Sequence, residues 1–422
     1  MTPVAARPTD LASVAIFAIA SLLVVAGAVA VVGFVRDPVS ITPICAFGDG
    51  KAYCAAAEGD RIPEAFSRRP VVPALARLLP TATARAFRAI SALGLLVAIA
   101  LAVILADRIA RRLDLWDRST RVAIGIIVAG AGLVAPHGLR MAWSVPILVD
   151  HASLAAGLLW LVLFTSRNRY ACMLSVPVTF LAGCTREIWG PVIAVTALSA
   201  LVVDRRRAIS AANVVVAVAA LITVTRLVPP IADQAIKYSE REVIEYSWNQ
   251  NFGSVDAVRH TAWRLAFAMG LLPLVLLLRP PLSWLRRELA QRDDTAAAVL
   301  LTAILVLGSA LVAGTDLTRY LFPAGFLFVI LAVPWLVSQR ALLAPAVVLV
   351  LVTMAVWDPD HHLIATEAEY VSYYYGGPIG IGDITPPTDR TTRALAVSAA
   401  AFVVAVALTA VAAVGQSEEP SS

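Results

Sequence analysis

The chain contains apolar runs that are too long for the interior of a soluble domain. Residues 11–34 form a run of 24 without a charged residue, and residues 394–415 form another of 22. A helix rises about 1.5 Å per residue, so each run can cross a hydrocarbon core about 30 Å thick. Of the 422 residues, 59% are hydrophobic and only 15% are charged. The sequence therefore predicts an all-α integral membrane protein.

Further apolar runs predict a polytopic bundle of about twelve spans that forms a single transmembrane domain over residues 1–422. The first run exceeds the apolar core of about 7 to 15 residues found in cleaved signal peptides, so we expect it to be retained. The internal runs cover residues 89–106, 122–136, 147–165, 170–185, 188–203, 208–228, 262–278, 295–313, 320–338 and 341–357.

Arginines collect in alternate short connections, near residues 108–121, 167–169, 205–207, 286–292 and 340. The positive-inside rule places these connections in the cytoplasm, together with both termini and the tail 416–422. Long outer loops are then expected at about 35–87, 229–261 and 358–393. Only two of the 34 basic residues are lysine, a bias typical of GC-rich bacterial genomes, so we expect a bacterial plasma membrane. Because the positive charge orients the spans, it does not indicate a nucleic-acid partner.

The first outer loop contains a carboxylate between two glycines, in Gly48–Asp49–Gly50. Asp and Gly are ordinary turn formers, which favours a simple loop turn. The glycines would equally let Asp49 approach a substrate without crowding. Cys45 and Cys54 flank Asp49 outside the cytoplasm, and we predict that they form a disulfide.

Other charged residues fall at predicted outer span ends. Arg186 and Glu187 are adjacent, so each needs a different partner, either in a structural ion pair or in a functional site. Asp316 and Arg319 have the spacing of a salt bridge on one helix face, although Arg319 could instead contact a phosphate. A buried hydrogen bond between Asp150 and His151, or a position at the interface, would account for those two residues.

Two further segments bear on the site. Residues 238–252 mix aromatic and charged side chains and predict a helix lying on the bilayer. His361 and His362 lack a matching ligand set with zinc spacing, so no metal site is assigned.

The first outer loop resembles that of bacterial multispanning glycosyltransferases of the C-type (GT-C) superfamily. The resemblance covers about 30 residues closely and the many-span plan loosely. Many members have paired acidic residues here, whereas the next acidic residues after Asp49 are Glu58 and Asp60, which leaves dependence on a divalent metal open. The matching residues are Asp49, Gly50 and Tyr53, then Arg68 or Arg69, and Pro73 with Leu75.

The resemblance implies a GT-C-like enzyme that transfers a sugar from a polyprenyl-phosphate donor to an envelope glycan, lipid or protein acceptor, with inversion. A lipid-linked donor is also expected physically, because nucleotide sugars are confined to the cytoplasm. Asp49 would be the catalytic base. The residues expected to bind substrate are Tyr53, Arg68, Arg69, Arg186, Glu187, Asp316 and Arg319.

Two other classes of function remain open. A transporter or flippase of an envelope precursor would use Asp150, Arg186 and Glu187 as a relay at the membrane midplane. A noncatalytic scaffold for envelope assembly would leave Asp49 dispensable. The three hypotheses differ in whether the charged groups converge near one surface, in a central channel, or nowhere.

Overall fold

The computed structural model describes a little over half of the chain. The described residues are 45, 48–60, 62, 67–113, 115, 118–134, 138, 142, 149–203, 207–227, 240–259, 261, 294–313 and 317–338. Among them the regular structure is helical, without a strand. The all-α prediction is confirmed for this part of the chain. The predicted spans at 11–34, 262–278, 341–357 and 394–415 lie outside it.

The described helices match the internal apolar runs closely. Three of them contain stretches long and apolar enough to cross a membrane, at Thr83–Arg112, Arg207–Arg226 and Thr295–Val312, which indicates a membrane protein. The helices of the bundle are α5 (Thr83–Arg112), α6 (Arg118–Val134), α8 (Asp150–Phe164), α9 (Arg169–Thr185), α10 (Trp189–Val203), α11 (Arg207–Ile222), which continues as the π-helix η1 (Thr223–Leu227), α15 (Asp294–Ala313) and α16 (Leu317–Ser338).

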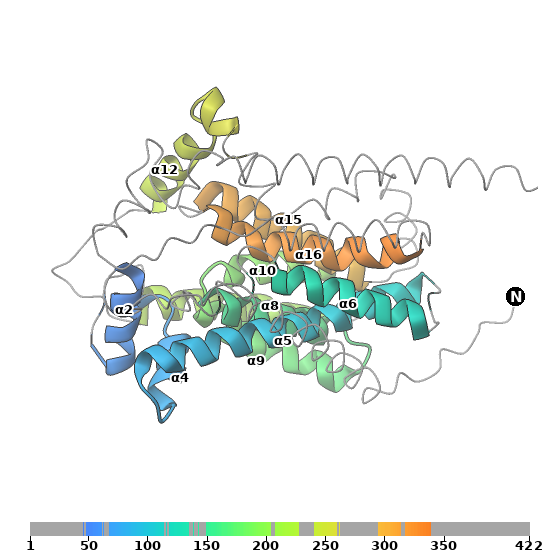
Figure 1. Ribbon diagram of the computed structural model, residues 1–422, viewed down its shortest axis with the longest axis horizontal. Coiled ribbons are helices and arrows are strands. Elements are labelled where there is room, and N and C mark those ends of the chain that lie inside the picture. The colour runs from blue at the N-terminus through green and yellow to red at the C-terminus, as the bar shows by residue number, and fades with distance from the viewer. Residues whose placement is uncertain are drawn as a thin grey trace, which may run out of the picture.

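Successive helices pack side by side in the bundle (Figure 1). α5 packs against α6, α8 and α16, while α9 lies against α8 and α11, and α10 lies against α11. The sequence partly encodes these close approaches. At Gly94 of α5, an added Cβ would lie 2.8 Å from the backbone nitrogen of Ala152 in α8. Only a residue without a side chain lets the two backbones meet there.

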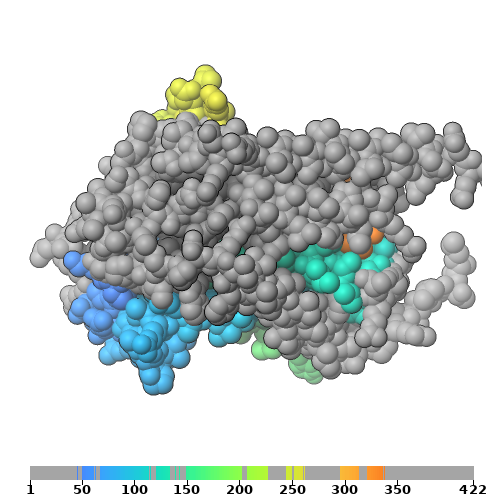
Figure 2. Space-filling view, viewed as in Figure 1, coloured from blue at the N-terminus to red at the C-terminus, as the bar shows by residue number. Residues whose placement is uncertain are grey.

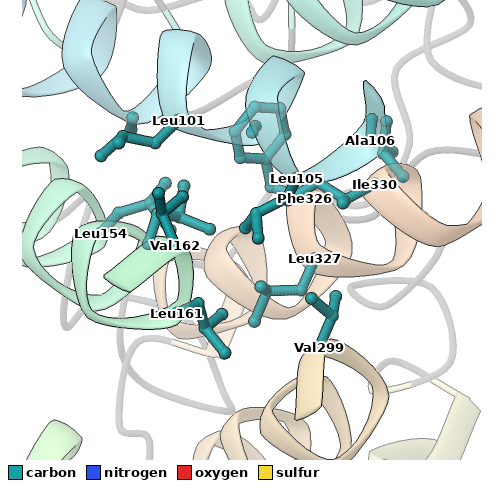
Figure 3. Packing of buried hydrophobic residues seen from close by; sticks show 14 of the residues in the cluster. Leu101, Leu105, Ala106, Leu154, Leu161, Val162, Val299, Phe326, Leu327 and Ile330 are labelled. Carbon is teal, nitrogen blue, oxygen red and sulfur yellow. The ribbon is translucent and has the colours of Figure 1, made fainter. Parts of the chain in front are cut away.

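The centre of the bundle is filled by apolar side chains from α5, α8, α15 and α16, which point toward one another in Figure 3. The labelled residues are Leu101, Leu105, Ala106, Leu154, Leu161, Val162, Val299, Phe326, Leu327 and Ile330. Leucines and valines on the outside remain exposed, including Leu93, Leu198 and Val215. An apolar exterior around an apolar core is the pattern of a lipid-embedded bundle.

The predicted outer loops contain helices. The first contains α2 (Gly48–Glu58) and α4 (Val71–Leu78), and the second contains α12 (Glu240–Phe252). The turn expected at Gly48–Asp49–Gly50 is wrong, because these residues form the first turn of α2. The helix predicted over residues 238–252 is confirmed as a helix, and it packs against α15 at one end of the bundle (Figure 1).

Arginines gather where α5, α6 and α8 meet at the opposite end from α2. Buried Asp107 accepts a hydrogen bond of 2.7 Å from Arg121 Nε and lies 2.7 Å from Arg111 Nη2. Arg108 donates to the carbonyl of Val162 at 2.7 Å, near the end of α8. Arg108, Arg111 and Arg121 of the first predicted inner connection therefore lie at the end of the bundle away from α2.

Candidate functional site

A small cap formed by α2 and α4 covers one end of the bundle, where α2 runs across the helices rather than along them (Figure 1). Its apolar interior brings Tyr53 and Cys54 of α2 against Val72 of α4 and Phe87 of α5. A disulfide joins Cys54 to Cys45, with the two Cα atoms 5.6 Å apart. The predicted disulfide is thus confirmed. It closes the chain segment that contains Asp49.

Arg69 joins this cap to the turn between α9 and α10. Its Nε donates to Glu187 Oε2 at 2.9 Å, and its Nη2 donates to Oε1 at 2.7 Å. Its remaining terminal nitrogen, Nη1, donates to the Tyr53 hydroxyl at 2.9 Å. The Arg69 side chain is 9% exposed and that of Glu187 is 29% exposed. The guanidinium fork thereby fixes α2, the chain before α4, and the α9–α10 turn relative to one another.

Arg186 and Glu187 have different partners, as their adjacency predicted. Arg186 follows the last residue of α9 in an extended conformation, with φ −155° and ψ 128°. Neighbouring residues in extended backbone direct their side chains to opposite sides. Arg186 therefore reaches Asp150, the first residue of α8, while Glu187 reaches Arg69. Both Arg186 and Asp150 are buried, so the pair resides inside the protein.

His151 lies beside this pair and belongs to a second polar contact. Its Nδ1 is 2.9 Å from Ser91 Oγ of α5, and its ring meets Phe322 of α16 edge-on, with centroids 6.0 Å apart. His151 is 1% exposed and Ser91 is 2% exposed. Asp150 therefore pairs with Arg186 at the end of α9, while His151 contacts Ser91 from α5.

The charges around Glu187 alter its pKa. Burial is the largest influence and raises the pKa, but the charge of Arg69, its hydrogen bonds and the charge of Arg186 lower it. The net effect lowers the pKa of Glu187 from 4.5 to about 2. Glu187 is therefore ionised at neutral pH and serves as an acceptor of hydrogen bonds. Arg186, the neighbour of Glu187 in sequence, is thus one of the charges that lower the pKa of Glu187.

The predicted site residues that the structure describes lie near one end of the bundle, and some of them are in direct contact. Tyr53, Arg69 and Glu187 are in contact, and Arg186 lies beside them. Arg68 is half-buried in the turn before α4. Asp49 precedes Tyr53 by one turn of α2, but its side chain lies outside the described part of the structure.

The last of the predicted site residues, Arg319, lies at the same end of the bundle. Arg319 lies in the first turn of α16, three residues before Phe322, which contacts His151. The Arg319 side chain and the whole of Asp316 are outside the described residues. The salt bridge expected between them and the phosphate contact expected of Arg319 both stay predictions.

Sequence reasoning missed Ser91 and Phe322. It grouped Asp150 with Arg186 only in the transporter hypothesis, as members of a relay, and did not predict the ion pair between them. One signal for Ser91 was available: a hydroxyl residue inside a long apolar run, one turn before Gly94. A polar side chain at that depth usually has a partner on a neighbouring helix. The partner itself, His151, could not be chosen from sequence because it is 60 residues away.

No group of three or more His, Cys, Asp or Glu side chains in the described ranges is placed to hold a metal ion. His361 and His362 lie beyond those ranges. No protein-family model, curated protein or solved structure matches the chain. The site itself brings two arginines and two carboxylates together with a tyrosine and a histidine at one end of the helices.

Proposed function

We propose that the protein is a membrane-embedded glycosyltransferase that uses a polyprenyl-phosphate sugar as donor and works at the end of the bundle capped by α2 and α4. The donor keeps its lipid in the bilayer and presents its phosphate and sugar at the cap. The acceptor is an envelope glycan, lipid or protein that approaches from the outer aqueous side.

The observation that carries this proposal is the contact of Arg69 with both Tyr53 and Glu187. Three residues expected to bind substrate, from three separate segments, meet beside the helix that contains Asp49. Buried charges of this kind are costly unless they are paired, and they often mark functional sites in membrane proteins. Their position at one end of the bundle favours surface chemistry over the transporter hypothesis, which requires a relay at the membrane midplane.

In the proposed reaction, Asp49 accepts the proton of an acceptor hydroxyl as that oxygen attacks the anomeric carbon. The bond from the anomeric carbon to the phosphate oxygen breaks as the new glycosidic bond forms, and the configuration inverts. The polyprenyl phosphate leaves with the bonding electron pair. Its negative charge is stabilised by nearby guanidinium groups, for which Arg68 and Arg319 are the proposed donors.

Arg69 and Glu187 have a positioning role in this scheme. Nε and Nη2 of Arg69 each donate a hydrogen bond to Glu187, and Nη1 donates one to the Tyr53 hydroxyl. Glu187 therefore orients Arg69, and Arg69 holds the Tyr53 hydroxyl one turn of α2 after Asp49. Arg69→Lys should keep the charge but lose the forked geometry, and we expect it to reduce transfer.

Incubating the purified full chain with defined polyprenyl-phosphate sugars and candidate acceptors tests the proposal. Formation of a glycosylated acceptor together with release of free polyprenyl phosphate would support it. Transport of a labelled lipid precursor across proteoliposomes without any transfer would instead favour the flippase hypothesis. The topology is tested separately with tags, which should report outside near Lys51 and Asn249 and inside near Leu115.

A further inference from the structure

The short helix α4 exposes leucines instead of burying them. Its inner face packs Val72, Pro73 and Ala76 into the cap. On its other side, Leu75 is 45% exposed, Leu78 is 78% exposed and Leu79, at the end of the helix, is 39% exposed. Spacings of three and four residues place these leucines on one helix face. An apolar stripe in this position is unfavourable in water and needs an apolar environment.

The leucines adjoin the exposed apolar surface of α5, a helix that begins four residues after Leu79. The exposed positions 85, 89, 93 and 97 recur every four residues and form one stripe along α5. Within this stripe Leu93 is 63% exposed and Val97 is 40% exposed, as expected for contact with acyl chains. The stripe ends at exposed Arg85, the kind of residue that places its charge at a headgroup layer.

A second exposed arginine lies beside the leucines. On the exposed face of α4, Arg77 lies at one edge and Leu79 lies at the opposite edge. The Arg77 guanidinium lies near Gly59, the residue after α2, where an added Cβ would be 3.2 Å from Arg77 Nη1. Figure 2 shows α4 and the start of α5 as a blue surface that faces the viewer at one edge of the molecule. The surface thus combines exposed leucines with two cationic groups.

We propose that α4 docks onto the surface of the lipid bilayer, with Leu75, Leu78 and Leu79 among the upper acyl chains and with Arg77 and Arg85 at anionic headgroups. This combination of an apolar face with flanking arginines matches the chemistry of a bilayer surface. Docking would hold Arg69, two residues before α4, at the headgroup level. The inference depends on membrane insertion and not on glycosyl transfer, so either can fail without the other.

The test places a spin label at Leu78→Cys in the full chain, reconstituted in vesicles of phosphatidylcholine with phosphatidylglycerol. Matched labels at Glu58→Cys, exposed at the end of α2, and at Leu93→Cys, exposed on α5, provide the aqueous and lipid references. Cys172 and Cys184 are buried, and labelling of the unaltered chain checks that they stay unreacted. Collision rates with oxygen and with a water-soluble nickel complex report the depth of each label.

We expect the label at position 78 to have an oxygen-to-nickel ratio severalfold above that at position 58 and close to that at position 93. Replacing both cations, by Arg77→Gln and Arg85→Gln, should move the label toward water, as should vesicles of phosphatidylcholine alone. A water-like ratio at position 78 in the mixed vesicles would overturn the proposal. Exclusion of both reagents from an immobilised label would also overturn it, because a protein partner or second copy would then cover α4.

Discussion

Arg69 donates two hydrogen bonds to Glu187, of 2.9 and 2.7 Å, although the two residues are 118 positions apart in sequence. The pair connects the cap to the α9–α10 turn. It also leaves the guanidinium oriented toward the Tyr53 hydroxyl. The geometry of this end of the bundle should therefore depend on Glu187 more than on the acidic residues of the cap itself, such as Glu58.

Glu187→Ala should lower the free energy of unfolding by about 3 kcal/mol, because it leaves a nearly buried arginine without its carboxylate. Thermal unfolding in detergent measures this change. Glu58→Ala is the matched control, since Glu58 is exposed at the end of α2, and we expect less than about 0.5 kcal/mol there. In a double-mutant cycle with Arg69→Met, additive losses would show that the two residues do not act as a pair.

The stabilising effect of Glu187 should disappear in acid. Its pKa is about 2 in the folded protein and near 4.5 when unfolded, so the unfolded chain binds more protons between these values. The contribution is complete above about pH 4.5 and is lost as the pH falls toward 2. The melting temperature of the unaltered protein should therefore fall more steeply below pH 4.5 than that of Glu187→Gln. Parallel curves for the two proteins would contradict the assignment.

The sequence predicted most of the described helices because their apolar runs are long and bounded by charged residues. It also predicted the disulfide between Cys45 and Cys54, since two cysteines in an outer loop have few other partners. It failed at Gly48–Asp49–Gly50, where local turn preferences indicated a loop. These residues are helical in the structure, and Tyr53 and Cys54 of the same helix pack beneath α4. The tertiary contacts therefore outweigh the low helix propensity of glycine.

The sequence did not indicate which charged residues of the site would pair with one another. The adjacency of Arg186 and Glu187 predicted that their partners would differ, which is confirmed. Which residues those partners are depends on how α8, α9 and the cap pack together. Asp150 and Arg69 are distant in sequence from the residues they bind, and no local pattern distinguishes them from other charges at the same end.

Gly94→Ala should disturb the packing of α5 on α8. The new methyl group would lie 2.8 Å from a backbone nitrogen, so the helices must separate, at a cost of about 1 to 3 kcal/mol. It should also lengthen the contact between Ser91 and His151. Gly308→Ala in α15 is the control, because no atom lies within 4 Å of its added Cβ. Thermal unfolding should show a loss for the first variant and a small gain for the second, and equal effects would refute the close approach.

Removal of the disulfide by Cys45→Ala should destabilise the cap by about 2 to 3 kcal/mol, because the short loop is no longer closed in the unfolded chain. Proteolysis between α2 and α4 should become faster while the bundle stays folded. A reducing agent should accelerate cleavage of the unaltered protein but not of the variant. Recovery of both Cys45 and Cys54 as alkylated free thiols from non-reduced protein would contradict the bond.

The most direct test of the proposed function compares Asp49→Asn with Asp60→Asn in the transfer of sugar from a polyprenyl-phosphate donor. Both changes remove one carboxylate from the same region while keeping its size, and Asp60 is exposed just after α2. We predict that Asp49→Asn inserts and folds normally but transfers sugar about 10²-fold to 10⁴-fold more slowly, the effect expected for loss of a general base. Asp60→Asn should retain the unaltered rate. Near-normal transfer by Asp49→Asn would contradict the mechanism.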